Sequence, residues 1–231
     1  MGEAPGGLRL WRGIECFVMF ALGPAVYALF ISAQYQRVLF PALWLFGLTC
    51  LTLLVTDKTF RKRQLAMGVG EGVVTTARGA LVEVLGVFFI LGALIVLAVA
   101  LWDMTLGDGD MLFSLPYQRP RLWLMIMIGY PLASVYMQEV IWRAAFFHRY
   151  QVLFPGRWSM IIASALAFGW VHIVFHNALA VIMTTVGGVM FAYTYDRTRS
   201  TLMVSLEHAL YGCLVFTVGI GRYFYSGAVG Q

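Results

Sequence analysis

Long apolar stretches separated by short polar connections follow one another along almost the whole chain. A helix rises ~1.5 Å per residue, so about 20 apolar residues cross the ~30 Å hydrocarbon core of a bilayer. About seven stretches have this length, and they cover residues 14–33, 38–56, 79–101, 122–147, 159–175, 178–195 and 201–223. The glycine-rich segment 68–79 is either a surface helix or part of an eighth span. The pattern predicts an all-α fold, a polytopic transmembrane helical bundle that forms a single domain over residues 1–231.

The composition excludes a soluble globular domain and a disordered chain. Of the 231 residues, 61% are hydrophobic and 12% are charged, whereas soluble domains have ~45–50% apolar and ~25% charged residues. So few charged side chains cannot cover the surface of a soluble protein of this size, and a disordered chain contains far fewer large apolar residues. The cysteines Cys16, Cys50 and Cys213 lie far apart inside apolar stretches. Neither a zinc ribbon nor a disulfide framework is therefore predicted.

The positions of the Lys and Arg residues predict the orientation in the membrane, because cytoplasmic connections carry an excess of them. With the N-terminus in the cytoplasm, the cytoplasmic side holds Arg9, Arg12, Lys58, Arg61, Lys62, Arg63, Arg78, Arg149, Arg157, Arg197 and Arg199. The other side holds Arg37, Arg119, Arg121 and Arg222, with the acidic residues Asp103, Asp108 and Asp110. Because the basic residues form short runs between apolar stretches rather than one basic face, we expect no nucleic-acid partner.

Three titratable side chains lie at similar depths near the middle of the predicted membrane. Measured along each helix from its cytoplasmic end, Glu139 is ~15 Å deep, His172 ~20 Å and His208 ~12 Å. Ionisable groups are costly in the hydrocarbon region, and by default they are candidates for function. Matching depths on three different spans favour one shared site.

Each of these residues also has a purely structural interpretation. Glu139 and Arg143 are spaced i,i+4, so the two can form a neutralising pair on one helix face. His172 and His208 can be core histidines, each hydrogen-bonded to a carbonyl or a hydroxyl. Because Glu139, His172 and His208 lie at similar depths, one shared functional site is favoured over three separate structural roles.

Other titratable residues are less suited to the site. His172 and His176 have the i,i+4 spacing of two zinc ligands, but the glutamate of the HExxH zinc signature is absent between them. Zinc held by His172 and His208 remains a less favoured alternative. Glu207 lies ~100° around the helix from His208, so the two cannot point equally into one site. Glu83 lies near the cytoplasmic edge and is expected outside the site.

A carboxylate and two histidines in a buried cavity suit two kinds of chemistry. In peptide hydrolysis, Glu139 with His172 would polarise a water molecule, and His208 would stabilise the oxygen of the tetrahedral intermediate. A proton-relay transporter uses the same residue types. The residue types alone therefore do not decide between a hydrolase and a transporter.

Three short motifs resemble those of a known family. They are QEVIWR at 138–143, FGWVH at 168–172 and HALYG at 208–212. In this order they resemble the EExxxR, FxxxH and HxxxN motifs of the CPBP intramembrane proteases, also called the ABI or CAAX-protease-like family. The resemblance covers a protease-like core at about 122–223.

The resemblance implies a mainly helical, multi-span protease of the glutamic type that needs no cofactor. Eukaryotic relatives remove the last three residues of prenylated CAAX proteins, and bacterial relatives are linked to bacteriocin immunity, peptide maturation and protein sorting. By resemblance, His172 would help the glutamate to activate water and His208 would help to hold the oxyanion. Arg143 would lock the first motif.

The chain departs from the family pattern at two positions. Gln138 takes the place of the first glutamate, which usually acts as the base, so Glu139 must act as base or hydrolysis is impaired. Adjacent helix positions differ by ~100°, and a kink at Pro131 would allow the rotation that this exchange requires. Gly212 takes the place of the asparagine. It removes a side-chain donor and is expected to leave room for substrate backbone, water or Tyr211.

The leading interpretation is an intramembrane endopeptidase that cleaves a membrane-associated peptide or protein tail. Its predicted site comprises Gln138, Glu139, Arg143, His172 and His208. The alternatives are a catalytically inactive relative that acts as a binding or immunity protein, and a proton-coupled transporter. The transporter is less favoured because the chain shows no repeated half. We expect an integral protein in contact with membrane lipid, located in a bacterial inner membrane, because the chain is compact and has no eukaryotic sorting signal.

Overall fold

The computed structural model describes residues 6–30, 38–68, 72–74, 76–107 and 109–224. Within these ranges, the regular secondary structure is entirely helical. Six helical segments are long and apolar enough to cross a membrane, namely Gly6–Phe30, Leu39–Thr56, Ala77–Thr105, Pro120–Tyr150, Arg157–Phe175 and Ala178–Thr198. A shorter apolar helix, Thr201–Thr217, follows them. The prediction of an all-α polytopic bundle with about seven spans is confirmed.

Several spans are built from more than one helical piece. The first contains α1 and α2, and the fourth contains α6, α7 and α8, joined by π-helical turns. The helices are α1 (Gly6–Phe17), α2 (Gly23–Phe30), α3 (Leu39–Thr56), α4 (Ala77–Thr105), α5 (Ser114–Gln118), α6 (Pro120–Tyr130), α7 (Tyr136–Glu139), α8 (Phe146–Tyr150), α9 (Arg157–Val171), α10 (Ala178–Thr198) and α11 (Thr201–Thr217).

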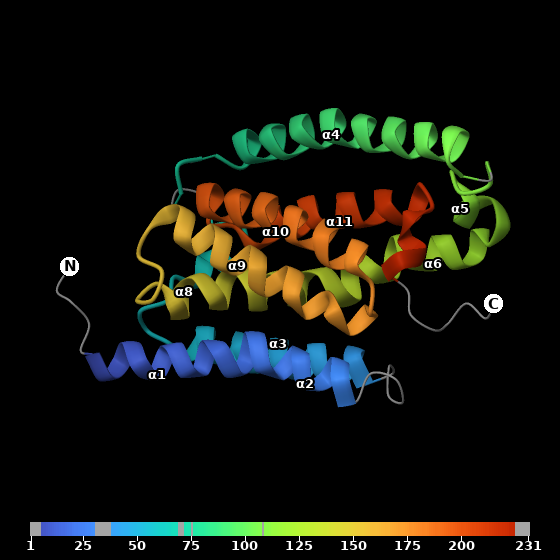
Figure 1. Ribbon diagram of the computed structural model, residues 1–231. Coiled ribbons are helices and arrows are strands. Elements are labelled where there is room, and N and C mark those ends of the chain that lie inside the picture. Colours follow the sequence, from blue (N-terminus) through green and yellow to red (C-terminus); the bar gives the residue numbers. More distant parts are fainter. Residues whose placement is uncertain (1–5, 31–37, 69–71, 75, 108, 225–231) are drawn as a thin grey trace.

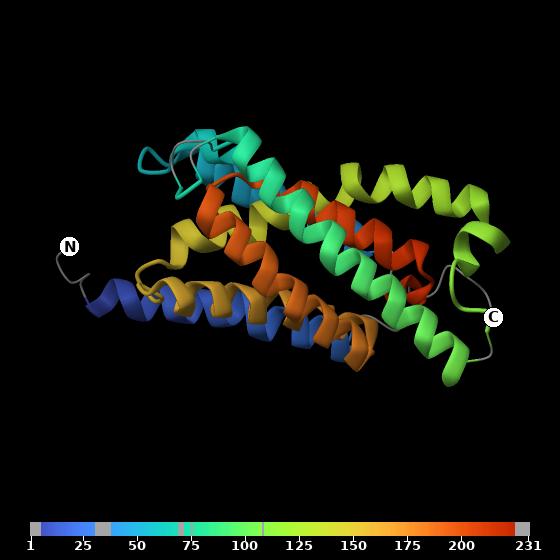
Figure 2. The same cartoon turned by 90° about the horizontal axis from the view of Figure 1, so that it is seen from above.

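The helices form layers that run along the long axis of the bundle. In Figure 1, α4 covers one face above α11, α1 to α3 cover the opposite face, and α9 and α10 lie between these layers. Seen from above, α4 crosses the bundle obliquely (Figure 2). The beginning of α1 and the last described helical turn lie toward opposite ends of the bundle in Figure 1, as an odd number of crossings requires.

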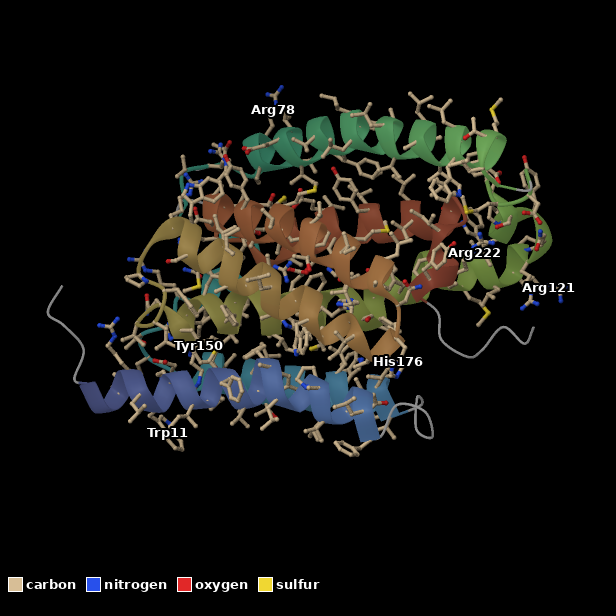
Figure 3. The ribbon with its side chains drawn as sticks, viewed as in Figure 1. Trp11, Arg78, Arg121, Tyr150, His176 and Arg222 are labelled. Carbon is tan, nitrogen blue, oxygen red and sulfur yellow. The ribbon has the colours of Figure 1, made fainter. Side chains whose placement is uncertain are left out.

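Polar contacts connect the first span to the fourth. Tyr150 of α8 is turned toward α1 (Figure 3), and its hydroxyl donates to Glu15 Oε1 at 2.8 Å. Arg149 Nη2 donates to Glu15 Oε2 at 2.8 Å. Because Glu15 receives both donors, the first span is fixed against the helix that carries the first motif.

Small residues let α9 and α10 pack closely. The Cα of Ala165 lies 3.1 Å from the place where a Cβ on Gly188 would stand. A Cβ on Gly169 would lie 2.9 Å from the Cβ of Thr185. Lipid tails are as apolar as side chains, so transmembrane helices associate through close packing of this kind rather than through the hydrophobic effect.

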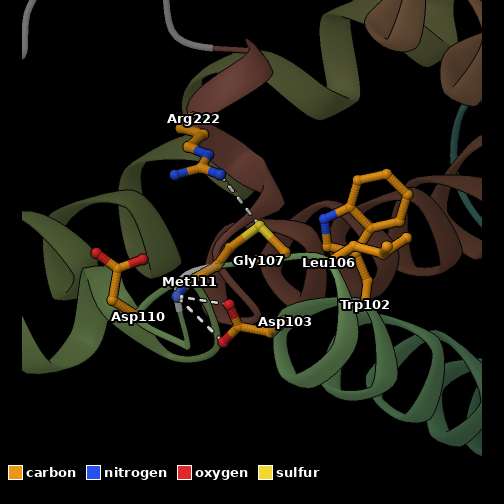
Figure 4. A pocket seen from close by; sticks show the side chains of 7 residues that line it. All are labelled: Trp102, Asp103, Leu106, Gly107, Asp110, Met111 and Arg222. Atoms are coloured by element: carbon orange, nitrogen blue, oxygen red, sulfur yellow. Dashed lines mark hydrogen bonds between the residues drawn. The ribbon is translucent and has the colours of Figure 1, made fainter.

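Helix α4 extends beyond the predicted span end at residue 101, so the connection after it begins later in the chain. Asp103 lies within the last turns of α4 and is 5% exposed. Its carboxylate accepts a hydrogen bond from the backbone N–H group of Met111 at 3.1 Å (Figure 4). It also accepts one from the backbone N–H group of Leu112 at 2.9 Å. Asp103 and Met111 line a small cavity of about 190 Å³ beside these bonds. Asp110 lies in the connection between α4 and α5 and lines that cavity, and Asp108 lies outside the described residues.

Glycines set two boundaries that the hydropathy pattern misplaced. Gly219 has φ +96°, a left-handed conformation typical of a helix end, and α11 stops at Thr217 rather than at residue 223. Gly68 and Gly72 lie directly against the backbone of the turn between α10 and α11. The described residues of 68–76 are not helical, and α4 begins at Ala77, so this part of the segment forms neither a surface helix nor an eighth span.

Candidate functional site

The fourth span positions the first motif between two distortions. π-helical turns at Pro131–Val135 and Val140–Ala145 flank the short helix α7. Trp44 Nε1 donates to the carbonyl of Ala133 at 2.8 Å, and Ser164 Oγ donates to the carbonyl of Trp142 at 2.7 Å. Such turns change which face each residue presents, and they occur frequently at functional sites.

Pro131 lies inside this span, as the sequence shows, and lacks the N–H that would bond the carbonyl of Met127. The thiol of Cys213 on α11 lies 3.9 Å from that carbonyl oxygen and supplies a weak donor. A neighbouring helix therefore provides the partner that the proline removes.

Glu139 and Arg143 form a fully buried ion pair. Arg143 Nε lies 3.1 Å from Glu139 Oε2, and both side chains are 0% exposed. The guanidinium also lies over the ring of Phe168, 4.5 Å from its centroid, and 5.5 Å from that of Phe191. Two aromatic faces and a carboxylate thus offset much of the cost of burying the cation.

His208 binds the second oxygen of the same carboxylate. Its Nδ1 lies 2.6 Å from Glu139 Oε1. A carboxylate only accepts, so Nδ1 carries a proton and donates it. The imidazole stacks on Phe191 with centroids 4.6 Å apart, which fixes the ring plane. Glu139 therefore uses one oxygen for Arg143 and the other for His208.

Gln138 and Glu139 face different surroundings. Gln138 lines a large cavity and donates from Nε2 to Ser134 Oγ at 2.8 Å. Glu139 is not among the described residues that line this cavity. The expected helix distortion is present, but it directs the carboxylate of Glu139 to Arg143 and His208 rather than to the cavity.

His172 lines the cavity, and its Nε2 has no hydrogen-bond partner among the described residues. It begins a 3₁₀ turn, His172–Phe175, at the end of α9. Nδ1 lies 2.7 Å from the carbonyl oxygen of Phe168 and must donate to it, so this nitrogen holds the proton of the neutral ring. Nε2 is then an acceptor, and the side chain lines the cavity. The rings of His172 and His208 both pack on Phe168, with centroids 4.9 and 5.4 Å away.

The cavity between the helices has a volume of about 1280 Å³ and is mostly apolar. It is large enough for a peptide segment, and a few polar groups among apolar walls are typical of a binding site. Polar side chains in its lining include those of Tyr27, Tyr130, Ser134, Gln138, His172, Thr184, His208 and Tyr211.

Tyr130 is a site residue that the motifs did not identify. Its hydroxyl lies 2.8 Å from His208 Nε2, so both nitrogens of His208 have partners. A Cβ on Gly212 would lie 2.6 Å from the Tyr130 hydroxyl oxygen and 2.7 Å from Cζ. The expectation that Gly212 leaves room for substrate, water or Tyr211 is therefore wrong, because the Tyr130 ring fills the space. In the sequence, the one signal that another side chain fills this space was Gly212 in place of the asparagine of the HxxxN motif.

The remaining acidic residues, histidines and cysteines of the spans are not among the described residues that line the cavity. Glu83 pairs with Arg197 at 2.7 Å near the end of the bundle. Glu207 is 3% exposed, and neither it nor His176 belongs to the described lining. The three cysteines are free thiols.

The site offers few free metal ligands. No group of three or more His, Cys, Asp or Glu side chains within the described part of the chain is arranged to hold a metal ion. Zinc on His172 and His208 would have to displace Tyr130 or Glu139 from His208. The residues present therefore do not fit a zinc site without rearrangement.

Comparison with known proteins agrees with the motif resemblance. Residues 120–214 match a family model described as type II CAAX prenyl endopeptidase Rce1-like. The match includes all three motifs and Tyr130. It confirms the predicted resemblance to the CPBP family over this segment and supports an intramembrane protease at the family level. No curated protein and no solved structure matches the chain significantly.

Proposed function

We propose that this protein is an intramembrane endopeptidase that cleaves a membrane-associated peptide or protein tail without a cofactor. The observation that carries the proposal is the free Nε2 of His172 in a large cavity that His208 also lines. One histidine is then an acceptor for a proton of water, and the other is held in place by a buried carboxylate. A base and a charged hydrogen-bonding group within one apolar cavity are the parts that peptide hydrolysis requires.

His172 is the proposed base for the attacking water. Its Nε2 takes one proton from water while the oxygen attacks the carbonyl carbon of the peptide bond, and the carbonyl oxygen becomes an oxyanion. The intermediate then breaks at the C–N bond, and the proton passes from Nε2 to the leaving amine. The hydrogen bond to the Phe168 carbonyl keeps the ring in the tautomer that can accept a proton.

Glu139 acts on the reaction through His208 in this proposal. Its carboxylate holds the proton on Nδ1, orients the ring and stabilises positive charge close to the forming oxyanion. Arg143 fixes the carboxylate from the other side. Gln138 cannot take a proton, and its amide is proposed to bind the substrate or the water.

A catalytically inactive binding protein is the second candidate. It is favoured by the amide of Gln138 at the cavity-facing position and by the contacts of the two Glu139 oxygens with Arg143 and His208. This candidate predicts that the protein binds peptide tails but does not cleave them. Proton-dependent solute uptake without proteolysis would instead favour the transporter.

The test uses full-length protein reconstituted into liposomes with internally quenched peptides, each prepared with and without a prenylated cysteine near its C-terminus. The wild type is expected to cleave at least one peptide, and His172→Ala is expected to reduce kcat by about 10²–10⁴-fold. His176→Ala is the matched control, because His176 lies at the end of the same span and outside the described cavity lining. Binding without cleavage would support the inactive candidate. Comparison of the membrane proteome with and without Glu139→Ala would identify the natural substrate.

The proposed location is a bacterial inner membrane with the N-terminus in the cytoplasm and lipid around the bundle. Large apolar side chains project outward from α4, among them Phe89 at 69% and Ile90 at 66% exposure, which supports contact with lipid tails. Labelling of single cysteines introduced at Arg63 and Arg119 by a membrane-impermeant maleimide tests the orientation. In intact cells, the Arg119→Cys variant is expected to react and the Arg63→Cys variant to be protected.

A further inference from the structure

We infer that the Tyr130 hydroxyl is the group that donates a hydrogen bond to the oxyanion, replacing the asparagine side chain that Gly212 lacks. This inference rests on the proposed peptidase function. It begins from the contacts of His208, since Nδ1 donates to Glu139 and Nε2 meets Tyr130. Although His208 lines the cavity, it therefore has no free nitrogen for a substrate, and its Nε2 acts on the substrate through the tyrosine.

The hydrogen bonds form a chain from the buried carboxylate to the cavity. When His208 carries protons on both nitrogens, Nδ1 donates to Glu139 and Nε2 donates to the Tyr130 oxygen. The Tyr130 O–H is then free to donate to the carbonyl oxygen of a substrate in the cavity that Tyr130 lines. The positive charge of the imidazolium strengthens this donor as negative charge forms on the substrate oxygen.

Gly212 makes this arrangement sterically possible. A Cβ at residue 212 would lie 2.6 Å from the Tyr130 hydroxyl oxygen, so a side chain at 212 and the present position of Tyr130 exclude each other. The tyrosine is held by edge-on contacts with His208 and Phe216, with centroids 6.0 and 5.9 Å away. Tyr130 is also the last residue of α6, directly before the π-helical turn Pro131–Val135. Because Gly212 has no side chain, the hydroxyl of Tyr130 on α6 can occupy the space beside it as a hydrogen-bond donor.

The first experiment removes the hydroxyl and keeps the ring. Tyr130→Phe is expected to reduce kcat on the quenched peptides by about 10²–10³-fold, the usual effect of deleting one oxyanion donor, with KM within about threefold of wild type. Tyr136→Phe is the matched control from the same span, since its hydroxyl bonds the Leu65 carbonyl at 2.8 Å and lies outside the described cavity lining. A Tyr130→Phe variant with wild-type kcat overturns the inference.

The second experiment exchanges the donors. Tyr130→Ala alone loses the hydroxyl, and Gly212→Asn alone forces a clash, so both single variants are expected to be strongly impaired. In the double variant the asparagine gains the vacated space, and kcat is expected to rise about tenfold above Tyr130→Ala. A double variant no more active than Tyr130→Ala contradicts the exchange.

A measurement independent of catalysis separates this inference from the proposed function. In protein labelled with ¹⁵N-histidine, Tyr130→Phe is expected to shift the Nε2 resonance of His208, and Tyr136→Phe is expected to leave it unchanged. An unchanged resonance in Tyr130→Phe refutes the hydrogen-bond chain whatever the enzyme's activity. Conversely, a wild-type protein that cleaves none of the peptides while the resonance shifts refutes the peptidase proposal and leaves the contact intact.

Discussion

The buried ion pair between Glu139 and Arg143 allows a quantitative test of how the site is held together. Both side chains are 0% exposed, and their charged atoms are 3.1 Å apart. Arg143→Met removes the cation and retains an apolar stem, which leaves the carboxylate with His208 as its remaining partner. Breaking a buried pair from one side costs about 3–5 kcal/mol, because the other charge stays buried without compensation.

A double-mutant cycle isolates the interaction of the two charges. Arg143→Met is expected to lower the free energy of unfolding by about 3–5 kcal/mol. Glu139→Gln/Arg143→Met should recover at least about 1.5 kcal/mol of that loss, since no isolated charge remains. The assay is reversible unfolding in mixed detergent micelles, followed by tryptophan fluorescence or circular dichroism.

The surface pair between Arg157 and Asp196 provides the control. Its atoms lie 2.7 Å apart, closer than those of the buried pair, but the Arg157 side chain is 43% exposed. Exposed pairs contribute only about 0–1 kcal/mol, so Arg157→Met should have a correspondingly small effect. A coupling energy below about 0.5 kcal/mol between Glu139 and Arg143 would show that the buried pair does not lock the first motif.

Three further predictions concern packing, pH and metal. Gly169→Ala should destabilise the bundle by about 1–3 kcal/mol in the same unfolding assay, because its Cβ would lie 2.9 Å from the Cβ of Thr185. Gly86→Ala on α4, with nothing within 4 Å of its Cβ, should change stability far less. Outside the spans, hydrogen bonds from His148 and Thr59 hold the pKa of Asp57 well below its usual range. A lowered carboxyl pKa contributes stability above the unfolded-state value of ~3.9, and this contribution is lost as the pH falls through the folded-state pKa. The melting temperature of the wild type relative to Asp57→Asn should therefore decrease as the pH falls below about 4, and a constant difference would contradict this. Chelators should leave peptide cleavage within about twofold of the untreated rate, whereas strong inhibition reversed by zinc would favour a metal mechanism at the two histidines.

The fold could largely be predicted from the hydropathy pattern, because a membrane leaves few alternatives to apolar helices. The pattern could not predict that α4 ends at Thr105, after Asp103, or that α11 ends at Thr217, before Gly219. At Asp103, a carboxylate bonds backbone N–H groups eight and nine residues further along the chain. At Gly219, the left-handed backbone depends on the close approach of Met111. Both features come from tertiary contacts rather than from local composition.

The motifs identified the polar residues of the site but not their connections. The depth calculation and the resemblance pointed to Glu139, His172 and His208. In the structure, the two histidines line one cavity, and Glu139 contacts the Nδ1 of His208. The direction of Glu139 depends on two π-helical turns that leave no clear sequence signal. Tyr130 was missed because its partner, His208, lies 78 residues away in the chain.

Cleavage of a quenched peptide by reconstituted protein, compared with Glu139→Ala and His172→Ala, tests the central claim most directly. The account predicts hydrolysis by the wild type, and turnover reduced by at least about 10²-fold in each variant, with both variants folded and inserted. Because the two residues come from different spans and have different roles in the attack on the peptide bond, their parallel loss would identify one catalytic site. Normal cleavage by either variant would contradict the role given to that residue, and normal cleavage by both would contradict the proposed site as a whole.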